Sequence, residues 1–191
     1  RAELHNELER KLEIQVLQSQ INPHFLYNTL GSISNVIRLG QIEKVDVVIG
    51  SLISILEYGI ADASEKVSLR QELRNVSDYI AIQNIRYNRH FQLVEHIEEG
   101  LMEFPVFRML LQPLVENSIF HGYSGGGIEG SITIHAYRNG GQVMIEVIDQ
   151  GEGITAERIQ HILVADPSDL EVKRKRIGLN NIHGRIRLHY G

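Results

Sequence analysis

The chain has 191 residues, of which 42% are hydrophobic and 23% are charged, and it contains no cysteine. This length is enough for one domain or two small ones with a buried core. The lack of cysteine excludes disulfides, thiolate metal ligands and a cysteine nucleophile. A formal net charge of −5 excludes a globally basic surface, so no nucleic-acid partner is expected. No apolar run approaches the roughly 20 residues that a membrane-spanning helix needs.

The first half of the chain has apolar residues at helical spacing. The three stripes are Leu26, Leu30, Ile33 and Ile37; Val45, Val48, Leu52 and Leu56; and Leu69, Leu73, Val76 and Ile80. Gly40 separates the first two and predicts an antiparallel hairpin, whose apolar faces would bury each other, and better still in a four-helix dimer. Ser68 and Gln71 have the pattern of a capping box and predict the start of the third helix. Residues 4–21 predict a helix ahead of the hairpin, either the end of a signalling coiled coil or a simple amphipathic helix.

From about His90 onwards the periodicity becomes that of mixed helices and strands. The predicted elements are a strand at 91–97, an apolar helix over 106–120 that Pro105 opens, strands at 131–138 and 142–149, a short helix from about Ala156 and a last helix over 179–190. Asn139, Gly140 and Gly141 between the two later strands are typical of a β-hairpin. The predicted fold class is therefore α+β, with helices packed on one face of a sheet.

One histidine stands at a predicted helix start, in the sequence Asn22-Pro23-His24-Phe25. Asn22 is a candidate N-cap and Pro23 a candidate first helical residue, which puts His24 in the first turn. There the positive end of the helix dipole favours a neutral imidazole, which is a nucleophile, and attracts anions. The alternative is an N-cap with an incidental histidine, and for a lone histidine that alternative is the better one.

Residues 111–122 form a second segment of interest, because polar residues interrupt its apolar helical pattern. Asn117 and His121 lie one turn apart on one face, and Glu116 precedes them. Polar groups on a buried helix need partners, and an amide oxygen is a suitable ligand for Mg²⁺. A polar cluster that bonds to neighbouring loops explains the same residues, and the segment alone slightly favours that explanation.

Two glycine-containing segments complete the set. Asp149 ends a predicted strand and is followed by Gly151 and Gly153, so the backbone can approach a ligand while the carboxylate accepts from a donor such as an adenine amino group. A Gly-x-Gly turn alone is weak evidence for this. Gly178 precedes a predicted helix whose N–H groups suit a phosphate. The basic run at 173–176 adds charge, although such runs are ordinarily solvated loops.

Together, in this order and spacing, the four segments resemble the sensor histidine kinases of the LytS/YesM type, from about Leu12 to Gly191. Residues 22–28 are similar to that family's phosphoacceptor box, and Asn117 lies in a segment similar to its N box. Residues 149–153 and 178–181 are similar to its two glycine boxes. The resemblance implies a helical dimerisation and histidine phosphotransfer domain at residues 1–88. It implies an ATP-binding α/β sandwich of the Bergerat type, shared with gyrase, Hsp90 and MutL, at residues 89–191.

The resemblance also implies residue roles. His24 would accept the γ-phosphoryl group of ATP and pass it to an aspartate on the receiver domain of a response regulator. Asn117 would hold Mg²⁺, with Glu116 as a possible second ligand, and Asp149 would bind adenine. The other nucleotide-binding candidates are His121, Gly151, Gly153, Gly178, Leu179 and Asn181. As a hypothesis from spacing, the amide of Asn28 would accept the ring N–H of His24 and orient the imidazole.

The same resemblance implies a homodimer through the N-terminal helices, an upstream membrane sensor, and hence the cytoplasmic portion of an inner- or plasma-membrane protein. Residues 155–177 would form a lid over ATP. The chain departs from the family at Phe120, where a basic residue is usual, and at Arg176, where glycine is frequent; a further strand would follow Gly191. These departures favour an alternative, a non-catalytic dimeric nucleotide-sensing module with a degenerate ATP site. A serine kinase or ATPase of the Bergerat fold is a third reading, but it does not need the Asn-Pro-His-Phe segment.

Overall fold

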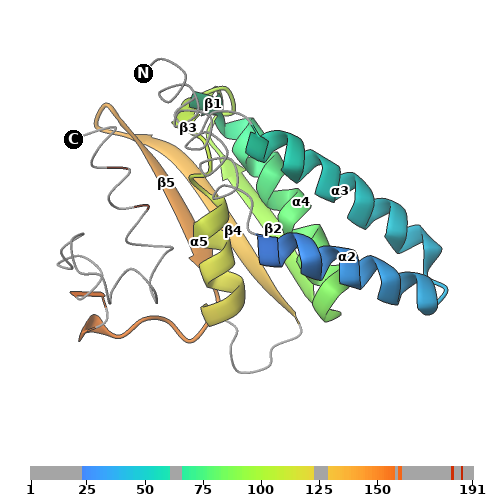
Figure 1. The fold of residues 1–191 in the computed structure, drawn as a ribbon. Coiled ribbons are helices and arrows are strands. Elements are labelled where there is room, and N and C mark those ends of the chain that lie inside the picture. Colours follow the sequence, from blue (N-terminus) through green and yellow to red (C-terminus); the bar gives the residue numbers. More distant parts are fainter. Residues whose placement is uncertain are drawn as a thin grey trace, which may run out of the picture.

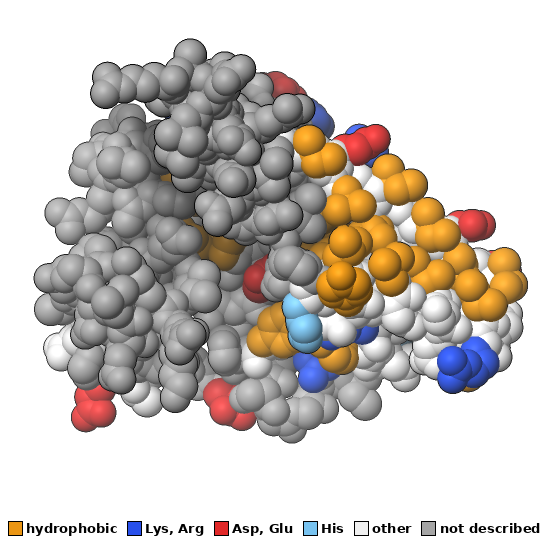
Figure 2. All heavy atoms as spheres, viewed as in Figure 1, with side chains coloured by type: hydrophobic (Ala, Val, Ile, Leu, Met, Phe, Trp, Pro, Cys, Tyr) orange, Lys and Arg blue, Asp and Glu red, His pale blue; other side chains and the backbone are white. Residues whose placement is uncertain are grey.

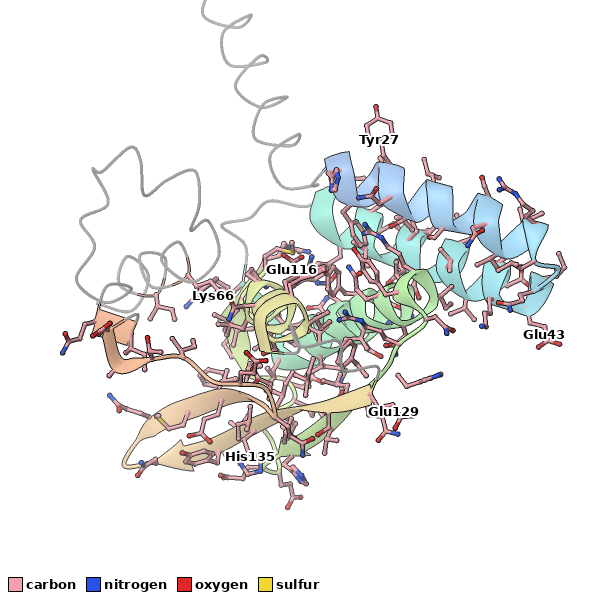
Figure 3. The ribbon with its side chains drawn as sticks, turned by 90° about the horizontal axis from the view of Figure 1, so that it is seen from below. Tyr27, Glu43, Lys66, Glu116, Glu129 and His135 are labelled. Carbon is pink, nitrogen blue, oxygen red and sulfur yellow. The ribbon has the colours of Figure 1, made fainter. Side chains whose placement is uncertain are left out.

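The structure is a computed structural model, which describes residues 23–60, 66–122, 129–157, 159–160, 182 and 186. Its elements are α2 (Pro23–Arg38), α3 (Ile42–Ile60), β1 (Lys66–Ser68), α4 (Leu69–Tyr87), β2 (His90–Ile97), β3 (Pro105–Phe107), α5 (Gln112–Asn117), the π-helix η1 (Ser118–Gly122), β4 (Glu129–Asn139) and β5 (Gln142–Asp149). They lie in three layers: the main sheet, then α4 and α5 on one of its faces, then the α2–α3 hairpin (Figures 1 and 3). The predicted α+β class is confirmed.

Helices α2 and α3 form the predicted hairpin, and Gly40 between them has a left-handed φ of +71°. The apolar stripe of α2 is only partly buried, because Leu30 and Ile37 are exposed while Thr29 and Val36 lie on the inner face. In α3 the buried residues are Val48, Ser51, Leu52, Ile55 and Gly59. A single copy of the hairpin therefore buries only part of the apolar surface that the sequence predicts to be buried.

Helix α4 lies between the hairpin and the sheet (Figure 3). It begins at the predicted capping box: Ser68 Oγ accepts from the backbone N–H of Gln71, and Gln71 Oε1 accepts from that of Ser68. The predicted apolar stripe is buried. A second set of buried residues is polar or carries a hydroxyl, and it consists of Glu72, Asn75, Tyr79 and Gln83. Because both neighbouring layers cover α4, these polar groups need partners inside the protein.

The main sheet has the strand order β2-β4-β5, with β2 parallel to β4 and β4 antiparallel to β5. The predicted β-hairpin is confirmed. Asn139 pairs with Gln142, which leaves Gly140 and Gly141 as a two-residue turn. Their φ values of +57° and +85° are left-handed, which glycine adopts without strain and which a hairpin turn of this length requires. The inward-facing residues of β4 are Ile132, Ile134 and Ala136, and all are buried.

The helix predicted over residues 106–120 is wrong in its first part. Pro105–Phe107 is the strand β3, which pairs antiparallel with β1, and α5 begins only at Gln112. Met109 has a left-handed φ of +61°, which a continuous right-handed helix does not allow. The backbone of residues 105–107 finds its hydrogen bonds in a short sheet instead, as buried backbone groups must.

The predicted domain boundary between residues 88 and 89 falls at the C-terminal end of α4, and it stays a prediction. Residues 156, 157, 159 and 160 are helical, within the predicted short helix, and Ile182 and Ile186 are helical within the predicted last one. The predicted helix at 4–21, the basic run at 173–176 and most of the predicted lid lie outside the described residues. None of the described helices is both long and apolar enough to cross a membrane.

Candidate functional site

His24 lies in the first turn of α2, directly after Pro23, and its side chain is exposed. Asn28 lies one turn further along the same helix, with its Nδ2 atom 2.9 Å from Nδ1 of His24. The predicted contact is therefore present, but in this arrangement the amide donates to the ring instead of accepting from it. A flip of the side-chain amide exchanges the positions of its oxygen and nitrogen. Asn28 can therefore donate to one tautomer of the ring or accept from the other.

Phe25 connects the beginning of α2 to α4. Its ring stacks on that of Tyr79, with the ring centroids 5.5 Å apart and the planes at 26°. Tyr79 is almost fully buried and faces Glu116 of α5. The end of the hairpin that carries His24 is thus linked through α4 to the helix that carries Asn117.

Asn117 and Glu116 are half-buried at the end of α5. The carboxylate of Glu116 accepts a hydrogen bond of 3.0 Å from Gln112, which in turn accepts one of 2.8 Å from Asn75 of α4. Burial raises the pKa of Glu116, and hydrogen bonding with Gln112 and Tyr79 partly opposes this effect. The observed partners of Glu116 are protein groups, and its role as a magnesium ligand stays a prediction.

After Asn117 the helix widens into η1, where one residue more is accommodated per turn. The backbone of His121 belongs to η1, whereas its side chain lies outside the described residues. Helix η1 contacts β5, the strand that ends in Asp149. The structure therefore brings together two of the four predicted segments, the one around Asn117 and the first glycine segment.

Asp149 is half-buried at the end of β5, and its Oδ1 atom accepts a 2.9 Å hydrogen bond from the backbone N–H of Gly151. A carboxylate has further lone pairs, so Asp149 can still accept from a ligand. Gly153 has a left-handed φ of +76°, which lets the chain turn sharply beyond the strand. The other predicted nucleotide-binding residues, Gly178, Leu179 and Asn181, lie outside the described residues.

Phe120, which departs from the expected basic residue, is 43% exposed. Its ring meets that of Tyr87 edge-on, with the centroids 6.1 Å apart. The guanidinium carbons of Arg86 and Arg89 lie 4.6 Å and 5.7 Å from the centre of the Tyr87 ring. Two cationic side chains, one in the last turn of α4 and one just beyond it, are therefore close to the ring of Tyr87, which Phe120 contacts.

The polar side of α4 was missed by the sequence reasoning, which considered only its apolar stripe. Glu72 accepts hydrogen bonds from the backbone of Met109 and Leu111, and Asn75 donates to Gln112. The signal is present in the sequence, because Glu72, Asn75, Tyr79 and Gln83 recur at steps of three and four. Such a polar stripe beside an apolar one indicates a helix that is covered on both sides.

Both halves of the chain match families of known proteins. The family described as histidine kinase matches residues 12–91, and the family of histidine kinase-, DNA gyrase B- and HSP90-like ATPases matches residues 105–191. The chain therefore contains the two domains of a sensor histidine kinase. Its second half is the ATPase-like domain, which implies that ATP is its ligand.

The relatives of this histidine kinase chain are similar along almost all of it. It is 36% identical to sensor histidine kinase YpdA of Escherichia coli (strain K12), over 100% of this chain and 33% of that protein. It is 34% identical to an uncharacterized sensor-like histidine kinase of Staphylococcus epidermidis, over 95% of this chain and 35% of the relative. Sensor protein kinase HptS of Staphylococcus aureus (strain USA300) is 31% identical, over 95% of this chain and 34% of the relative. The chain spans about a third of the length of these curated relatives.

The residue types at the site fit ATP and Mg²⁺. The amide oxygen of Asn117 is a hard donor of the kind that Mg²⁺ accepts, and this ion completes its shell with water and phosphate oxygens. Asp149 offers a carboxylate acceptor, which suits an exocyclic amino group. Asn117 directly precedes η1, and η1 contacts β5, the strand that ends in Asp149, so the two residues lie on adjoining elements.

Proposed function

We propose that this chain phosphorylates itself on His24 with ATP and passes the phosphoryl group to an aspartate of a response regulator. The observation that carries the proposal is an exposed histidine at a helix start, in contact with Asn28, in one chain with an ATPase-like domain. A neutral ring nitrogen attacks the γ-phosphorus, the bond to the bridging oxygen breaks, and ADP leaves with its electron pair. The other ring nitrogen releases its proton to water. In the second step an aspartate oxygen attacks the phosphorus and the N–P bond breaks. The ring nitrogen keeps the electron pair of that bond, and the ring takes up a proton from water to become a neutral imidazole again.

The residues at the site need only bind and orient, because phosphoryl transfer depends mainly on positioning and charge neutralisation. Asn28 would hold the imidazole of His24 in the attacking orientation. Asn117 would hold Mg²⁺, which when bound neutralises charge on the phosphates. Asp149 would accept from the adenine amino group. The backbone at Gly151, Gly153, Gly178, Leu179 and Asn181, with His121, would line the nucleotide.

Labelled ATP with Mg²⁺ tests this function directly. We expect label that is labile to acid and stable to alkali in the wild type, and no label in His24→Gln. The matched control is His135→Gln, because His135 points away from the helices on the outer face of the sheet (Figure 3) and should retain the label. We expect Asn28→Ala to slow the labelling without weakening ATP binding. Equal labelling of His24→Gln and the wild type would overturn the assignment of the acceptor.

A non-catalytic nucleotide-sensing module is the second candidate. The exposed aromatic pair of Phe120 and Tyr87 favours it, because position 120 then provides no charge to a phosphate. The same assay separates the two functions. Nucleotide binding without any acid-labile label would support the sensing module, whereas acid-stable label on a hydroxyl would indicate a serine kinase.

We infer that the hairpin is the interface of a homodimer. Its exposed large apolar side chains are Tyr27, Leu30, Ile37, Leu39, Ile42, Val47, Ile49, Ile53 and Ile60. In Figure 2, hydrophobic side chains extend over the face of α2 and α3 that is in view. An apolar patch of this extent on a soluble protein is typical of an interaction site, and two hairpins can bury it in a four-helix bundle. The family relation further suggests a receiver domain as a partner and a membrane sensor that precedes this cytoplasmic portion.

A further inference from the structure

Glu72 of α4 is a buried carboxylate that the proposed reaction does not use. Its side chain is 0% exposed. Oε1 accepts from the backbone N–H of Met109 at 2.6 Å, and Oε2 accepts from that of Leu111 at 2.8 Å. Both donors belong to the turn that leads from β3 into α5. A carboxylate of one helix thus fixes the backbone at the beginning of another.

Helix α5 begins without a capping side chain. Its N-cap residue is Leu111, whose apolar side chain cannot accept a hydrogen bond. Glu72 instead accepts from the backbone N–H of this N-cap residue, and so holds the position at which α5 begins. Because α5 has only 6 residues and ends at Asn117, a displacement of its first turn is a displacement of Asn117 as well.

The same carboxylate contacts the hairpin. The hydroxyl of Tyr58, near the end of α3, donates to Oε1 of Glu72. Arg108, from the turn before α5, donates to the backbone carbonyl of Tyr58 at 2.8 Å and lies 4.6 Å from the centre of its ring. The end of α3 and the turn before α5 are therefore held to each other and to Glu72.

Stability alone is a poor explanation for this cluster. A buried charge is costly to desolvate, and apolar replacements of similar volume are often as stable or more so. The cost is consistent with the pKa of Glu72, which burial raises while its backbone and tyrosine donors oppose the change. What a buried carboxylate adds is geometry, since each of its oxygens holds specific donors in place. Here those donors come from two different parts of the molecule.

We propose that Glu72 is a positioning residue that couples the hairpin carrying His24 to the helix carrying Asn117. A displacement of α3 is transmitted through Tyr58 and Glu72 to the first turn of α5, and so to the nucleotide site. This inference rests on the proposed role of Asn117 in binding the nucleotide. It assigns to Tyr58, a residue of the hairpin, an effect on a site in the other half of the chain.

The test uses the full-length protein with Glu72→Gln and Tyr58→Phe. Each change removes a charge or a hydroxyl and leaves the shape of the side chain. The matched controls are Glu146→Gln and Tyr137→Phe, because Tyr137 donates to Glu146 at 3.2 Å on the outer face of the sheet. Two quantities are measured: the affinity for Mg–ADP, and the hydrogen exchange of the amides of residues 109–117 without nucleotide. Circular dichroism at the assay temperature checks that each variant is folded.

We expect Glu72→Gln to weaken Mg–ADP binding about tenfold, the equivalent of one lost charged hydrogen bond. Tyr58→Phe should weaken it about threefold, since a neutral donor is worth less. In both variants the amides of Met109 and Leu111 should exchange faster than in the wild type. The two controls should stay within about twofold of the wild type in affinity and show unchanged exchange at these amides. Such local effects in fully folded variants are not expected from a merely structural role.

The inference is overturned if folded Tyr58→Phe keeps both the wild-type affinity and the wild-type exchange at residues 109–117. A failure of the proposed function gives a different result. In that case the wild type does not bind Mg–ADP, or Asn117→Ala binds it as tightly as the wild type. The exchange measurement needs no nucleotide and decides between coupling and no coupling in either case.

Discussion

The α2–α3 hairpin and the region around the sheet, in which we include α4, bury their apolar residues to different extents. Around the sheet, the fully buried side chains come from several elements and include Leu69, Ile82, Phe107, Leu111 and Ile134. In the hairpin, by contrast, much of the apolar surface is exposed, and Tyr27 is 73% exposed and points away from the rest of the chain (Figure 3). The region around the sheet builds its own core, whereas the hairpin leaves an apolar surface that the proposed dimer would bury.

The polar contacts of the two regions also differ, in how far apart in the chain the partners lie. Around α4 and α5, buried polar groups pair across elements, as Asn75 does with Gln112. In α2 the side-chain hydrogen bonds are local, such as those from Thr29 to the carbonyl of Phe25 and from Ser32 to that of Thr29. Long-range polar contacts fix one arrangement of a site, whereas local ones leave a helix free to pack against different neighbours. The region around the sheet is therefore suited to precise geometry, and the hairpin to association.

The largest expected effect on stability comes from a substitution in the core of the ATPase-like half. Ile134 lies on the central strand β4 and is fully buried, so Ile134→Ala should lower the free energy of unfolding by about 2–5 kcal/mol. Ile37 in the hairpin is 52% exposed, and Ile37→Ala should change the stability of the monomer by less than about 0.5 kcal/mol. Urea unfolding of both variants, at a protein concentration too low for dimerisation, measures this difference in stability. Equal losses would contradict the distinction between the two halves.

Self-association, unlike stability, should be sensitive to substitutions in the hairpin and insensitive to those around the sheet. Ile53 is exposed on α3, and Ile53→Glu would bring a charge into the proposed dimer interface in both copies. We expect the dimer dissociation constant to rise more than about tenfold, because a desolvated unpaired charge costs over 1.4 kcal/mol. Ile148→Glu, at an equally exposed isoleucine of β5, is the control and should leave association unchanged. Sedimentation velocity measures both, and a dimer that persists in Ile53→Glu would place the interface elsewhere.

Local signals in the sequence predicted most of the fold. The hairpin follows from helical periodicity and Gly40, and the strand pair follows from the turn at Gly140 and Gly141, where two left-handed residues are needed. The capping box at Ser68 is equally local. In each case the residues that decide the structure are within a few positions of one another, which is why the sequence alone indicates them.

Partners far apart in the chain could not be predicted in this way. Strand β3 exists because the backbone of residues 105–107 meets that of residues 66–68, and an apolar run after a proline gives no sign of such pairing. Glu72 finds its backbone donors 37 and 39 residues further along the chain. Similarly, spacing within one helix predicted the contact of His24 with Asn28, but not the interaction of Glu116 with Tyr79 of α4.

A smaller effect concerns the contact between the hairpin and α4. The hydroxyl of Ser54 in α3 donates to Asp78 of α4 at 2.7 Å, and Ser51 donates to the other oxygen of the same carboxylate at 3.1 Å. Ser54→Ala should lower the free energy of unfolding by about 1 kcal/mol, because one charge-assisted hydrogen bond is lost while Ser51 still partners the carboxylate. Ser34→Ala, on the exposed side of α2, is the matched control and should be neutral or slightly stabilising, as alanine favours a helix. A loss in Ser34→Ala as large as in Ser54→Ala would show that the contact with Asp78 is not the cause.

The smallest effect belongs to the surface of the ATPase-like half, where Glu98 links the end of β2 to β4. Its carboxylate accepts from the backbone N–H and from the guanidinium of Arg138, each at 2.7 Å. These bonds hold the pKa of Glu98 below its ordinary value of 4.5. A carboxyl whose pKa is lowered by folding stabilises the protein above that value, and the contribution is lost as the pH falls through the lowered pKa. The wild type should therefore be slightly more stable than Glu98→Gln at neutral pH, and the difference should vanish in acid. Thermal unfolding of both proteins, from neutral pH to below the lowered pKa, measures this difference in stability. A difference that grows in acid would show that the contact with Arg138 does not favour the charged carboxylate.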